Sequence, residues 1–168
     1  QQGLAGAGEW ETLRKLLPDF KDKRVLDLGC GYGWHCIYAM EHGASSVVGV
    51  DISHKMLEVA KEKTHFPQVE YKCCAIEDVE FPEESFDVIL SSLAFHYVAD
   101  YEILVKKIYR ILKSGGKLVF TVEHPVFTAY GTQDWHYNEK GEILHFPVDN
   151  YYYEGKRTAV FLGEKVTK

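Results

Sequence analysis

The feature that most constrains this chain is a short apolar stretch that ends in a run of glycines. Residues 25–28 are apolar except for one acid, Asp27, and helix-compatible sequence begins at Trp34. Between them stand three glycines at alternate positions: Gly29, Gly31 and Gly33. A strand, a glycine turn and a helix in this order let a ligand lie against bare backbone at a helix start. The pattern therefore predicts an α/β sheet with a nucleotide site at the turn.

The spacing of the glycines separates two kinds of nucleotide site. A dinucleotide-binding turn has the pattern G-x-G-x-x-G, which would place its third glycine at position 34. Trp34 occupies that position and Gly33 comes one residue earlier, so the pattern is G-x-G-x-G. A nicotinamide-dependent oxidoreductase is therefore the less favoured interpretation.

Strand-like and helix-like segments alternate through residues 1–122. After residues 25–28, further strands are predicted over residues 46–51, 69–76, 86–90 and 117–122. Helices are predicted over residues 9–17, 34–42, 54–63 and 100–113, the last ended by residues 114–116, Ser-Gly-Gly. This alternation is typical of an α/β fold with a Rossmann-like, doubly wound and mostly parallel sheet.

A second acid follows the second predicted strand. Asp51 lies about twenty residues beyond the glycines, where a carboxylate at a strand end can accept hydrogen bonds from both hydroxyls of a ribose. Ser53 is the better cap for the helix that follows, so we expect Asp51 to be free for a ligand. Met56 stands close enough in sequence to Asp51 to touch the nucleoside of the same ligand.

Two stretches closely resemble class I S-adenosylmethionine-dependent methyltransferases of the type 11 kind. Residues 25–33, Val-Leu-Asp-Leu-Gly-Cys-Gly-Tyr-Gly, resemble the first motif of that family, and residues 81–98 resemble its loop, fourth strand and post-strand segment. The resemblance covers about residues 24–124. It implies S-adenosylmethionine as cofactor, S-adenosylhomocysteine as product, and methyl transfer to a small-molecule acceptor.

The resemblance also implies roles for particular residues. The acid matching Asp27 lies near the methionine ammonium group, and Ser91 with Ser92 faces the methionine end of the cofactor. An acid that holds adenine in many relatives is replaced here by Ala75. Either Glu77 or Asp78 would have to serve instead, or the backbone at residues 75 and 76 alone; we favour the backbone of Ile76 and the side chain of Glu77. The residues expected to bind the cofactor are Asp27, Gly29, Cys30, Gly31, Gly33, Asp51, Ile52, Met56, Ala75, Ile76, Glu77 and Ser91.

Methyl transfer to oxygen or nitrogen can use a general base. His96 and His124 both follow predicted strands on the cleft side and are the candidates for this role, although a lone histidine is more often structural. Tyr97, Trp135 and Tyr137 are candidates to line the acceptor pocket. The sequence shows neither a Ser-His-Asp grouping nor a metal-ligand cluster, so we expect no metal.

Residues 123–168 differ from the rest of the chain in being rich in aromatic side chains. Strand-like pieces over residues 142–146, 150–153 and 158–162 with turns at residues 138–141 and 154–156 predict hairpins. These hairpins either form a lid over the substrate or pack as a small sheet on the domain edge. We therefore interpret residues 1–168 as one methyltransferase domain, with an N-terminal cap helix in 1–23, a cofactor-binding core in 24–122 and a lid in 123–168.

The family's sheet normally has seven strands, and no segment here matches the last two. Together with the missing initiator methionine, this suggests a fragment of a longer protein. If the fragment were the whole molecule, its fifth strand would be an open edge, which invites pairing with another chain or covering by the hairpins. In the cap helix, Trp10 either packs on the sheet or reaches the cofactor.

Composition bounds the remaining possibilities. A net charge of −6 argues against a nucleic-acid binder with a broad basic face, and no apolar run is long enough for a membrane span. The four cysteines, Cys30, Cys36, Cys73 and Cys74, are expected to be small buried thiols in a reducing cytosol. We expect a cytoplasmic monomer or homodimer. A non-catalytic module that binds an adenosyl ligand or a protein partner is the other alternative.

Overall fold

The computed structural model describes residues 3–129, 133–161 and 164–167. The chain divides into two compact units, one from Gln1 to Val122 and one from Glu123 to Lys168. The division falls where the aromatic-rich sequence begins. Each unit is described by itself.

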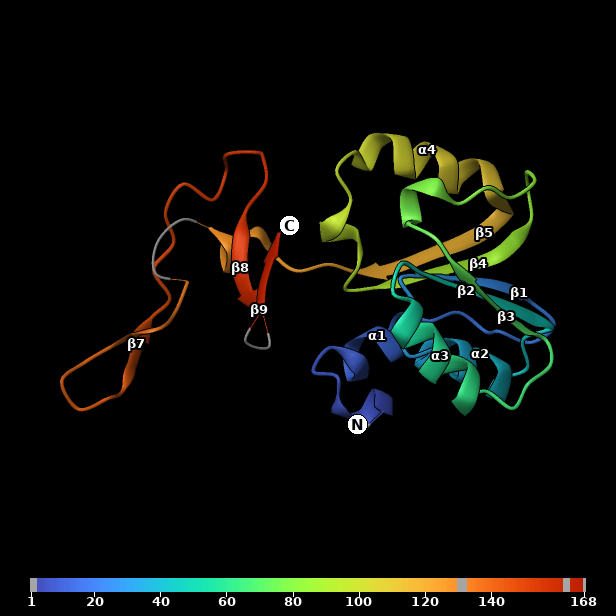
Figure 1. Ribbon diagram of the computed structural model, residues 1–168, viewed down its shortest axis with the longest axis horizontal. Helices are drawn as coiled ribbons and strands as arrows, with labels where there is room; N and C mark the ends of the chain where they lie inside the picture. The colour runs from blue at the N-terminus through green and yellow to red at the C-terminus, as the bar shows by residue number, and fades with distance from the viewer. Residues whose placement is uncertain (1–2, 130–132, 162–163, 168) are drawn as a thin grey trace. The chain divides into compact units, whose positions relative to one another are not determined.

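The first unit is a five-stranded parallel sheet with helices on both faces (Figure 1). Its strands are β1 (Arg24–Leu28), β2 (Ser46–Asp51), β3 (Val69–Cys73), β4 (Phe86–Ser92) and β5 (Leu112–Thr121), in the order β3-β2-β1-β4-β5. Helices α1 (Trp10–Leu16), α2 (Trp34–Glu41) and α3 (His54–Lys63) lie on one face, and α4 (Tyr101–Ile111) covers the other. The predicted doubly wound, Rossmann-like fold is confirmed.

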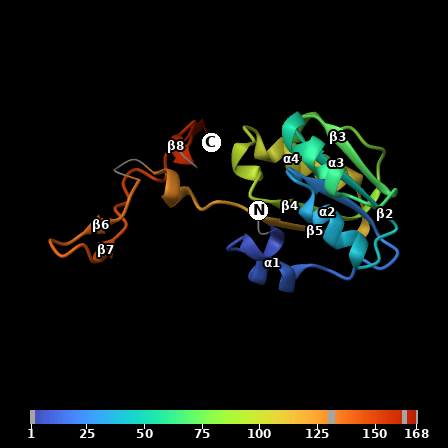
Figure 2. The same cartoon turned by 60° about the horizontal axis from the view of Figure 1, so that its bottom comes forward.

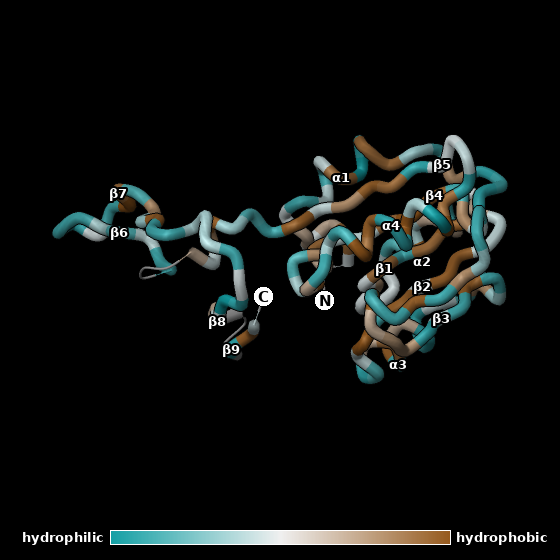
Figure 3. Tube along the Cα trace, turned by 90° about the horizontal axis from the view of Figure 1, so that it is seen from above, coloured by the Kyte–Doolittle hydropathy of each residue, from teal (hydrophilic) through white to brown (hydrophobic). Residues whose placement is uncertain are grey.

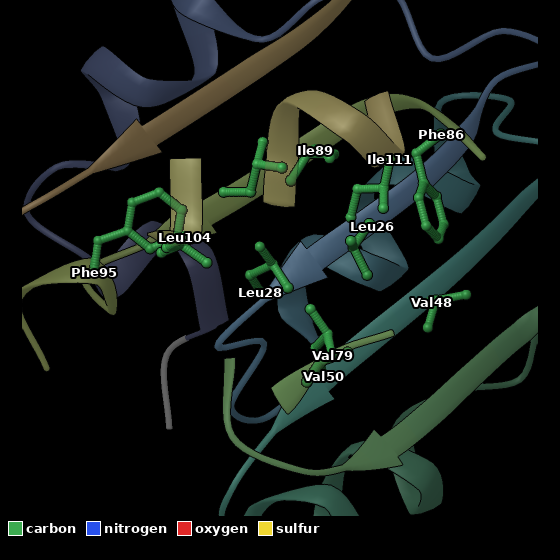
Figure 4. Close-up of a cluster of buried hydrophobic side chains, with 11 residues drawn as sticks. Leu26, Leu28, Val48, Val50, Val79, Phe86, Ile89, Phe95, Leu104 and Ile111 are labelled. Carbon is green, nitrogen blue, oxygen red and sulfur yellow. The ribbon is translucent and has the colours of Figure 1, made fainter. Parts of the chain in front are cut away.

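The sheet is apolar on both faces because each face is covered by helices. Leu26 and Leu28 of β1 point into the cluster beneath α4, together with Phe86 and Ile89 of β4 (Figure 4). Val25 points the other way, into a cluster with α2 and α3. The central strands accordingly form the hydrophobic stretches of the trace in Figure 3.

Side-chain caps fix the starts of two helices. The Ser53 hydroxyl accepts a hydrogen bond from the Met56 N–H at 3.4 Å, and an Asp100 carboxylate oxygen accepts one from the Ile103 N–H at 2.9 Å. These contacts satisfy backbone donors that have no partner within the helix. Short 3-10 turns complete this unit: η1 (Gly3–Gly6), η2 (Ile76–Asp78) and η3 (Phe95–Tyr97).

The predicted boundary between α4 and the fifth strand is wrong. The helix ends at Ile111 and β5 begins at once at Leu112, so Ser114 and its two following glycines lie inside the strand. Phe86 pairs with Leu112, but Val88 pairs with Lys117, so extra residues of β5 bulge out of the ladder. Gly115, with a φ of 76°, supplies the left-handed backbone of this bulge.

The second unit contains two antiparallel hairpins. Strands β6 (His136–Tyr137) and β7 (Ile143–His145) pair around the turn predicted at residues 138–141 (Figure 2). Strands β8 (Thr158–Phe161) and β9 (Glu164–Thr167) form the other, following η4 (Pro125–Thr128). The strand predicted over residues 158–162 is present through residue 161, and Leu162 lies outside the described residues.

The strand predicted over residues 150–153 and the hairpin turn predicted over residues 154–156 are wrong. Asn150 has a φ of 52°, and its carbonyl accepts a hydrogen bond from the Tyr153 N–H at 3.4 Å, so the segment is a turn. The Arg157 guanidinium donates to the carbonyls of Tyr151 and Tyr153. A neighbouring strand would need those same carbonyls, so the arginine holds the segment in its folded-back form.

Gly33 occupies a position that has no room for a side chain. Its φ is 75°, and a Cβ there would lie 2.2 Å from the Tyr71 hydroxyl and 3.1 Å from the Ala60 Cβ. The Tyr71 hydroxyl is itself hydrogen-bonded to the Thr64 hydroxyl at 2.8 Å. The third glycine of the turn therefore lets α2 begin directly against β3 and α3.

We predict that Gly33→Ala lowers the free energy of unfolding by about 3 kcal/mol, because it combines a strained φ with an overlap that the fixed tyrosine cannot relieve. Urea denaturation measures the change. Gly8→Ala is the matched control, since no atom lies within 4 Å of a Cβ at Gly8. Equal stability of the two variants would contradict the packing role given to Gly33.

Candidate functional site

The carboxyl ends of the five parallel strands meet at one edge of the sheet. The chain moves outward from β1 to β2 and β3 on one side, and from β4 to β5 on the other. In such sheets a ligand binds outside the strand ends, at the point where the strand order reverses. That point lies between β1 and β4, and the glycine turn directly follows β1.

The glycine turn is held against β2 by its backbone. The N–H groups of Gly29 and Cys30 both donate to the Val50 carbonyl, at 2.8 and 2.9 Å. Gly29 has a φ of 79°, and a Cβ on it would lie 2.4 Å from the Ala94 Cβ and 3.5 Å from the Ile76 Cδ1. The loops after β1, β3 and β4 therefore converge on the bare backbone of Gly29.

Both carboxylate oxygens of Asp51 accept hydrogen bonds from backbone N–H groups, which the sequence pattern did not predict. One carboxylate oxygen accepts the Gly31 N–H at 2.8 Å, and the other accepts the Ser53 N–H at 2.8 Å. Each carboxylate oxygen can accept a further hydrogen bond. The two backbone contacts therefore orient the carboxylate at the end of β2 and still leave it able to accept hydroxyl donors.

Asp27 lies beneath the turn with one oxygen satisfied and the other not. The side chain is 1% exposed, and its Oδ2 accepts a hydrogen bond from the Cys36 thiol at 3.5 Å. Its Oδ1 is buried and has no hydrogen-bond partner among the described residues. Burial raises the pKa of the Asp27 carboxyl, an effect that nearby His35 partly offsets. A buried, unpaired acceptor of this kind suits a cationic ligand group.

The loop after β3 contributes mainly backbone. The Cys74 N–H donates to the Asp51 carbonyl at 3.1 Å, which places the loop beside the end of β2. Ile76 is partly buried against the core, whereas the Glu77 side chain is exposed. The backbone carbonyl of Glu77 accepts a hydrogen bond from the Lys107 ammonium group at 2.6 Å. Ala75 is partly buried in the same loop.

Two side chains after β2 flank the turn. Met56 lies near Gly31, since a Cβ on that glycine would be 3.8 Å from the methionine sulfur. Ile52 is 74% exposed directly after Asp51. An apolar side chain so exposed at the strand ends is available to a ligand. Both Ile52 and Met56 are among the residues that the sequence predicts to bind the cofactor.

Ser91 does not face the cleft with its side chain as expected. It is 1% exposed, and its hydroxyl donates to the Leu28 carbonyl at 2.8 Å. The hydroxyl therefore joins the end of β4 to the end of β1. Only the backbone of Ser91 borders the ligand edge, by which we mean the carboxyl ends of the five parallel strands.

No sequence pattern indicates the polar contact that joins the N-terminal segment to the strand ends. The Ser92 hydroxyl donates to the Glu9 carboxylate at 3.1 Å and lies 3.3 Å from the Thr121 hydroxyl. The Leu93 N–H donates to the Thr121 hydroxyl at 3.1 Å, with Leu93 itself at a φ of 52°. Glu9 and Ser92 are 83 residues apart, a separation that local pattern cannot bridge.

Trp10 packs on helix α2. Its ring is 7% exposed, with its centroid 4.8 Å from that of Tyr38 and 5.6 Å from that of His35. Of the two expectations for Trp10, the structure therefore supports packing.

The two candidate bases have different surroundings. His96 is half-buried in η3, with its ring centroid 4.3 Å from that of Tyr97. His124 belongs to the second unit, and its Nδ1 accepts a hydrogen bond from the Val126 N–H at 3.3 Å. A neutral histidine that accepts through Nδ1 carries its proton on Nε2, so His124 must release this contact before it can act as a base.

The cysteines are not all buried. Cys30 and Cys36 are buried, Cys74 is partly exposed, and Cys73 is exposed, which corrects the expectation for that residue. Cys73 is the last residue of the edge strand β3, and its thiol donates to the Ile52 carbonyl at 3.6 Å. Among the described residues, no group of three or more histidine, cysteine or acidic side chains is placed to hold a metal ion.

Comparisons with known proteins agree with this geometry. Residues 26–120 match the family model for a methyltransferase domain. The chain belongs to this family, the class I S-adenosylmethionine-dependent methyltransferases. The family's cofactor is S-adenosylmethionine, and the buried acceptor on Asp27 fits the cationic end of that molecule.

Two solved structures are similar over nearly the whole chain. A candidate S-adenosylmethionine-dependent methyltransferase from Listeria monocytogenes is 56% identical with a TM-score of 0.90, over 98% of this chain and 74% of its own. An S-adenosylmethionine-dependent methyltransferase from Mesorhizobium loti is 41% identical with a TM-score of 0.84, over 92% of this chain and 70% of its own.

Curated relatives are longer than the chain. The ubiquinone biosynthesis O-methyltransferase of Coxiella burnetii is 36% identical over 112 residues, which are 66% of this chain and 47% of that protein. Another relative is matched over 61% of its length, so the chain spans about half to three fifths of these proteins. Within the described part of the chain, no helix combines the length and apolar character needed to cross a membrane.

We predict that Asp27→Asn stabilises the ligand-free chain at neutral pH. Folding raises the pKa of this carboxyl above its ordinary 3.8, so the ionised group costs stability once the pH exceeds that value. Below it the carboxyl is protonated in both states and the cost disappears. Urea denaturation at several pH values should therefore show an advantage of the variant that shrinks as the pH falls. A variant less stable than the wild type at neutral pH would refute this.

Proposed function

We propose that this chain transfers the methyl group of S-adenosylmethionine to a small-molecule acceptor, leaving S-adenosylhomocysteine. The observation that carries the proposal is the placement of two carboxylates beside one glycine turn. Asp27 offers a buried, unpaired oxygen, and Asp51 is held by the Gly31 N–H at 2.8 Å. One suits an ammonium group and the other suits ribose hydroxyls.

Other residues of the edge would complete the site. Ile52 and Met56 would contact the adenosine, while the backbone of Ile76 and the carboxylate of Glu77 would hold adenine. Gly29, Cys30 and Gly31 would present bare backbone to the amino-acid portion. The cofactor supplies the reactive methyl carbon, so the chain's task is to align the acceptor and exclude water.

An oxygen acceptor is supported by the name of the Coxiella burnetii relative, an O-methyltransferase. Such an acceptor loses a proton during transfer. We favour His96 as the base because it follows β4 in the unit that carries the glycine turn, whereas His124 belongs to the second unit. Tyr97, about half exposed beside His96, is a candidate acceptor contact. Trp135 and Tyr137 remain candidates from the sequence.

Calorimetric titration with S-adenosylmethionine, S-adenosylhomocysteine and NAD tests the proposal. We expect both adenosyl ligands to bind and NAD not to bind. Binding of NAD alone would favour an oxidoreductase. Adenosyl binding without turnover across a panel of phenol, alcohol and amine acceptors would favour a non-catalytic module.

We predict that Asp51→Ala weakens S-adenosylhomocysteine binding by about 1–3 kcal/mol, through loss of charged hydrogen bonds to the ribose. Because this change also frees the Gly31 N–H, the ribose contribution needs a matched ligand. The analogue lacking the ribose 3′-hydroxyl should lose less affinity than S-adenosylhomocysteine does in the same variant. Equal losses for the two ligands would assign Asp51 to the turn alone.

For an acceptor found in that panel, we predict that His96→Ala lowers kcat by more than tenfold while cofactor affinity changes little, since a general base contributes about 10²–10⁴-fold. His124→Ala should have a smaller effect on kcat. Steady-state kinetics and cofactor titration separate the two quantities. Unchanged kcat in both variants would remove the histidines as bases.

A further inference from the structure

We propose that Cys36 is a positioning residue for the cofactor. Its thiol holds one oxygen of Asp27 so that the other oxygen is presented to the ammonium group of the methionine portion. This inference rests on the proposed function, because it requires that an adenosyl ligand with an ammonium group binds at the glycine turn.

The contact joins two elements that the glycine turn separates in sequence. Asp27 lies in β1, and Cys36 lies in the first turn of α2, which begins directly after Gly33. Both side chains are buried, at 1% and 0% exposure, and the thiol sulfur lies 3.5 Å from Asp27 Oδ2. The thiol therefore reaches the carboxylate from the helix at whose N-terminus the ligand would bind.

The flanking strands offer the carboxylate no other side-chain donor. Asp27 lies in register with Gly49 of β2 and Leu90 of β4, and neither has a polar side chain. Oδ1 remains without a hydrogen-bond partner among the described residues. Cys36 is thus the contact that distinguishes the two oxygens and limits rotation of the carboxylate.

A thiol at this place stays a donor. Burial raises the pKa of Cys36 well above its ordinary value, so the group keeps its proton at neutral pH. The titratable groups facing Asp27 are His35 and Cys36 of α2, Cys30 of the turn, Asp51 of β2 and Tyr71 of β3. Among these, the Cys36 hydrogen bond and His35 favour the ionised carboxylate, and Asp51 opposes it.

Binding of three ligands to Cys36→Ala tests the proposal, because they differ only in the methionine portion. S-adenosylhomocysteine carries ammonium and carboxylate, decarboxylated S-adenosylhomocysteine carries ammonium alone, and 5′-methylthioadenosine carries neither; all three are neutral at sulfur. We expect Cys36→Ala to weaken the first two by about 3- to 10-fold, the loss of one modest hydrogen bond to a charged group, and to leave the third unchanged. Cys36→Ser, which keeps a donor, should recover most of the affinity.

Two variants separate positioning from packing. Val47→Ala truncates a fully buried side chain in the same apolar cluster as Cys36 and removes no polar contact. It should lower thermal stability without selecting among the three ligands. In an Asp27→Asn background, Cys36→Ala should cause no further selective loss for the two ammonium ligands.

The pH dependence of binding gives a readout that packing would not move. Losing the thiol donor raises the pKa of Asp27, so the pH below which S-adenosylhomocysteine affinity declines should be higher in Cys36→Ala. Equal losses for all three ligands, or no loss for any, would overturn the inference while leaving the proposed function intact. Failure of the wild-type chain to bind S-adenosylhomocysteine would instead overturn the proposed function.

Discussion

The hydrogen bonds from Gly29 and Cys30 to the Val50 carbonyl are the contacts on which the ligand edge depends. They pull the turn after β1 onto the end of β2, which is possible only because Gly29 adopts a positive φ without a side chain. Ala94 then fills the space that a Cβ would occupy, so the loop after β4 also lies against the turn. Backbone contacts therefore bring the loops of the candidate site together, and the side chains of those loops complete it.

Some side chains at the carboxyl ends of the strands form hydrogen bonds within the protein, and others keep acceptors that a ligand can use. Ser91 satisfies the Leu28 carbonyl, and Asp51 uses one acceptor position on each oxygen for backbone N–H groups. Asp27 is the exception, since a buried carboxylate with an orphan oxygen weakens the fold. Such a cost is expected where a ligand, and not the folded chain, completes the hydrogen bonding.

Sequence reasoning succeeded where the determinants were local. Apolar runs predicted the parallel strands, and Ser53 and Asp100 marked the helix starts that the structure shows. It failed where a distant partner decided the outcome. The Gly31 N–H that holds Asp51, and the Leu28 carbonyl that takes the Ser91 hydroxyl, are brought close only by the fold. The turn at residues 150–153 has a nearby determinant instead, the Arg157 guanidinium, which donates to the carbonyls of Tyr151 and Tyr153. A pattern of strand-favouring residues does not reveal such a side-chain donor even when it is near in sequence.

The contact between Glu9 and Ser92 extends this reasoning to the end of β4. Glu9 stands at the start of α1, but its side chain makes no capping hydrogen bond; its carboxylate instead accepts from the Ser92 hydroxyl at the end of β4. A carboxylate that forgoes a local hydrogen bond for one 83 residues away anchors the N-terminal segment at that strand end. Because α1 also packs Trp10 on α2, the segment is held at both places. The N-terminal segment is therefore a fixed part of the border of the candidate site.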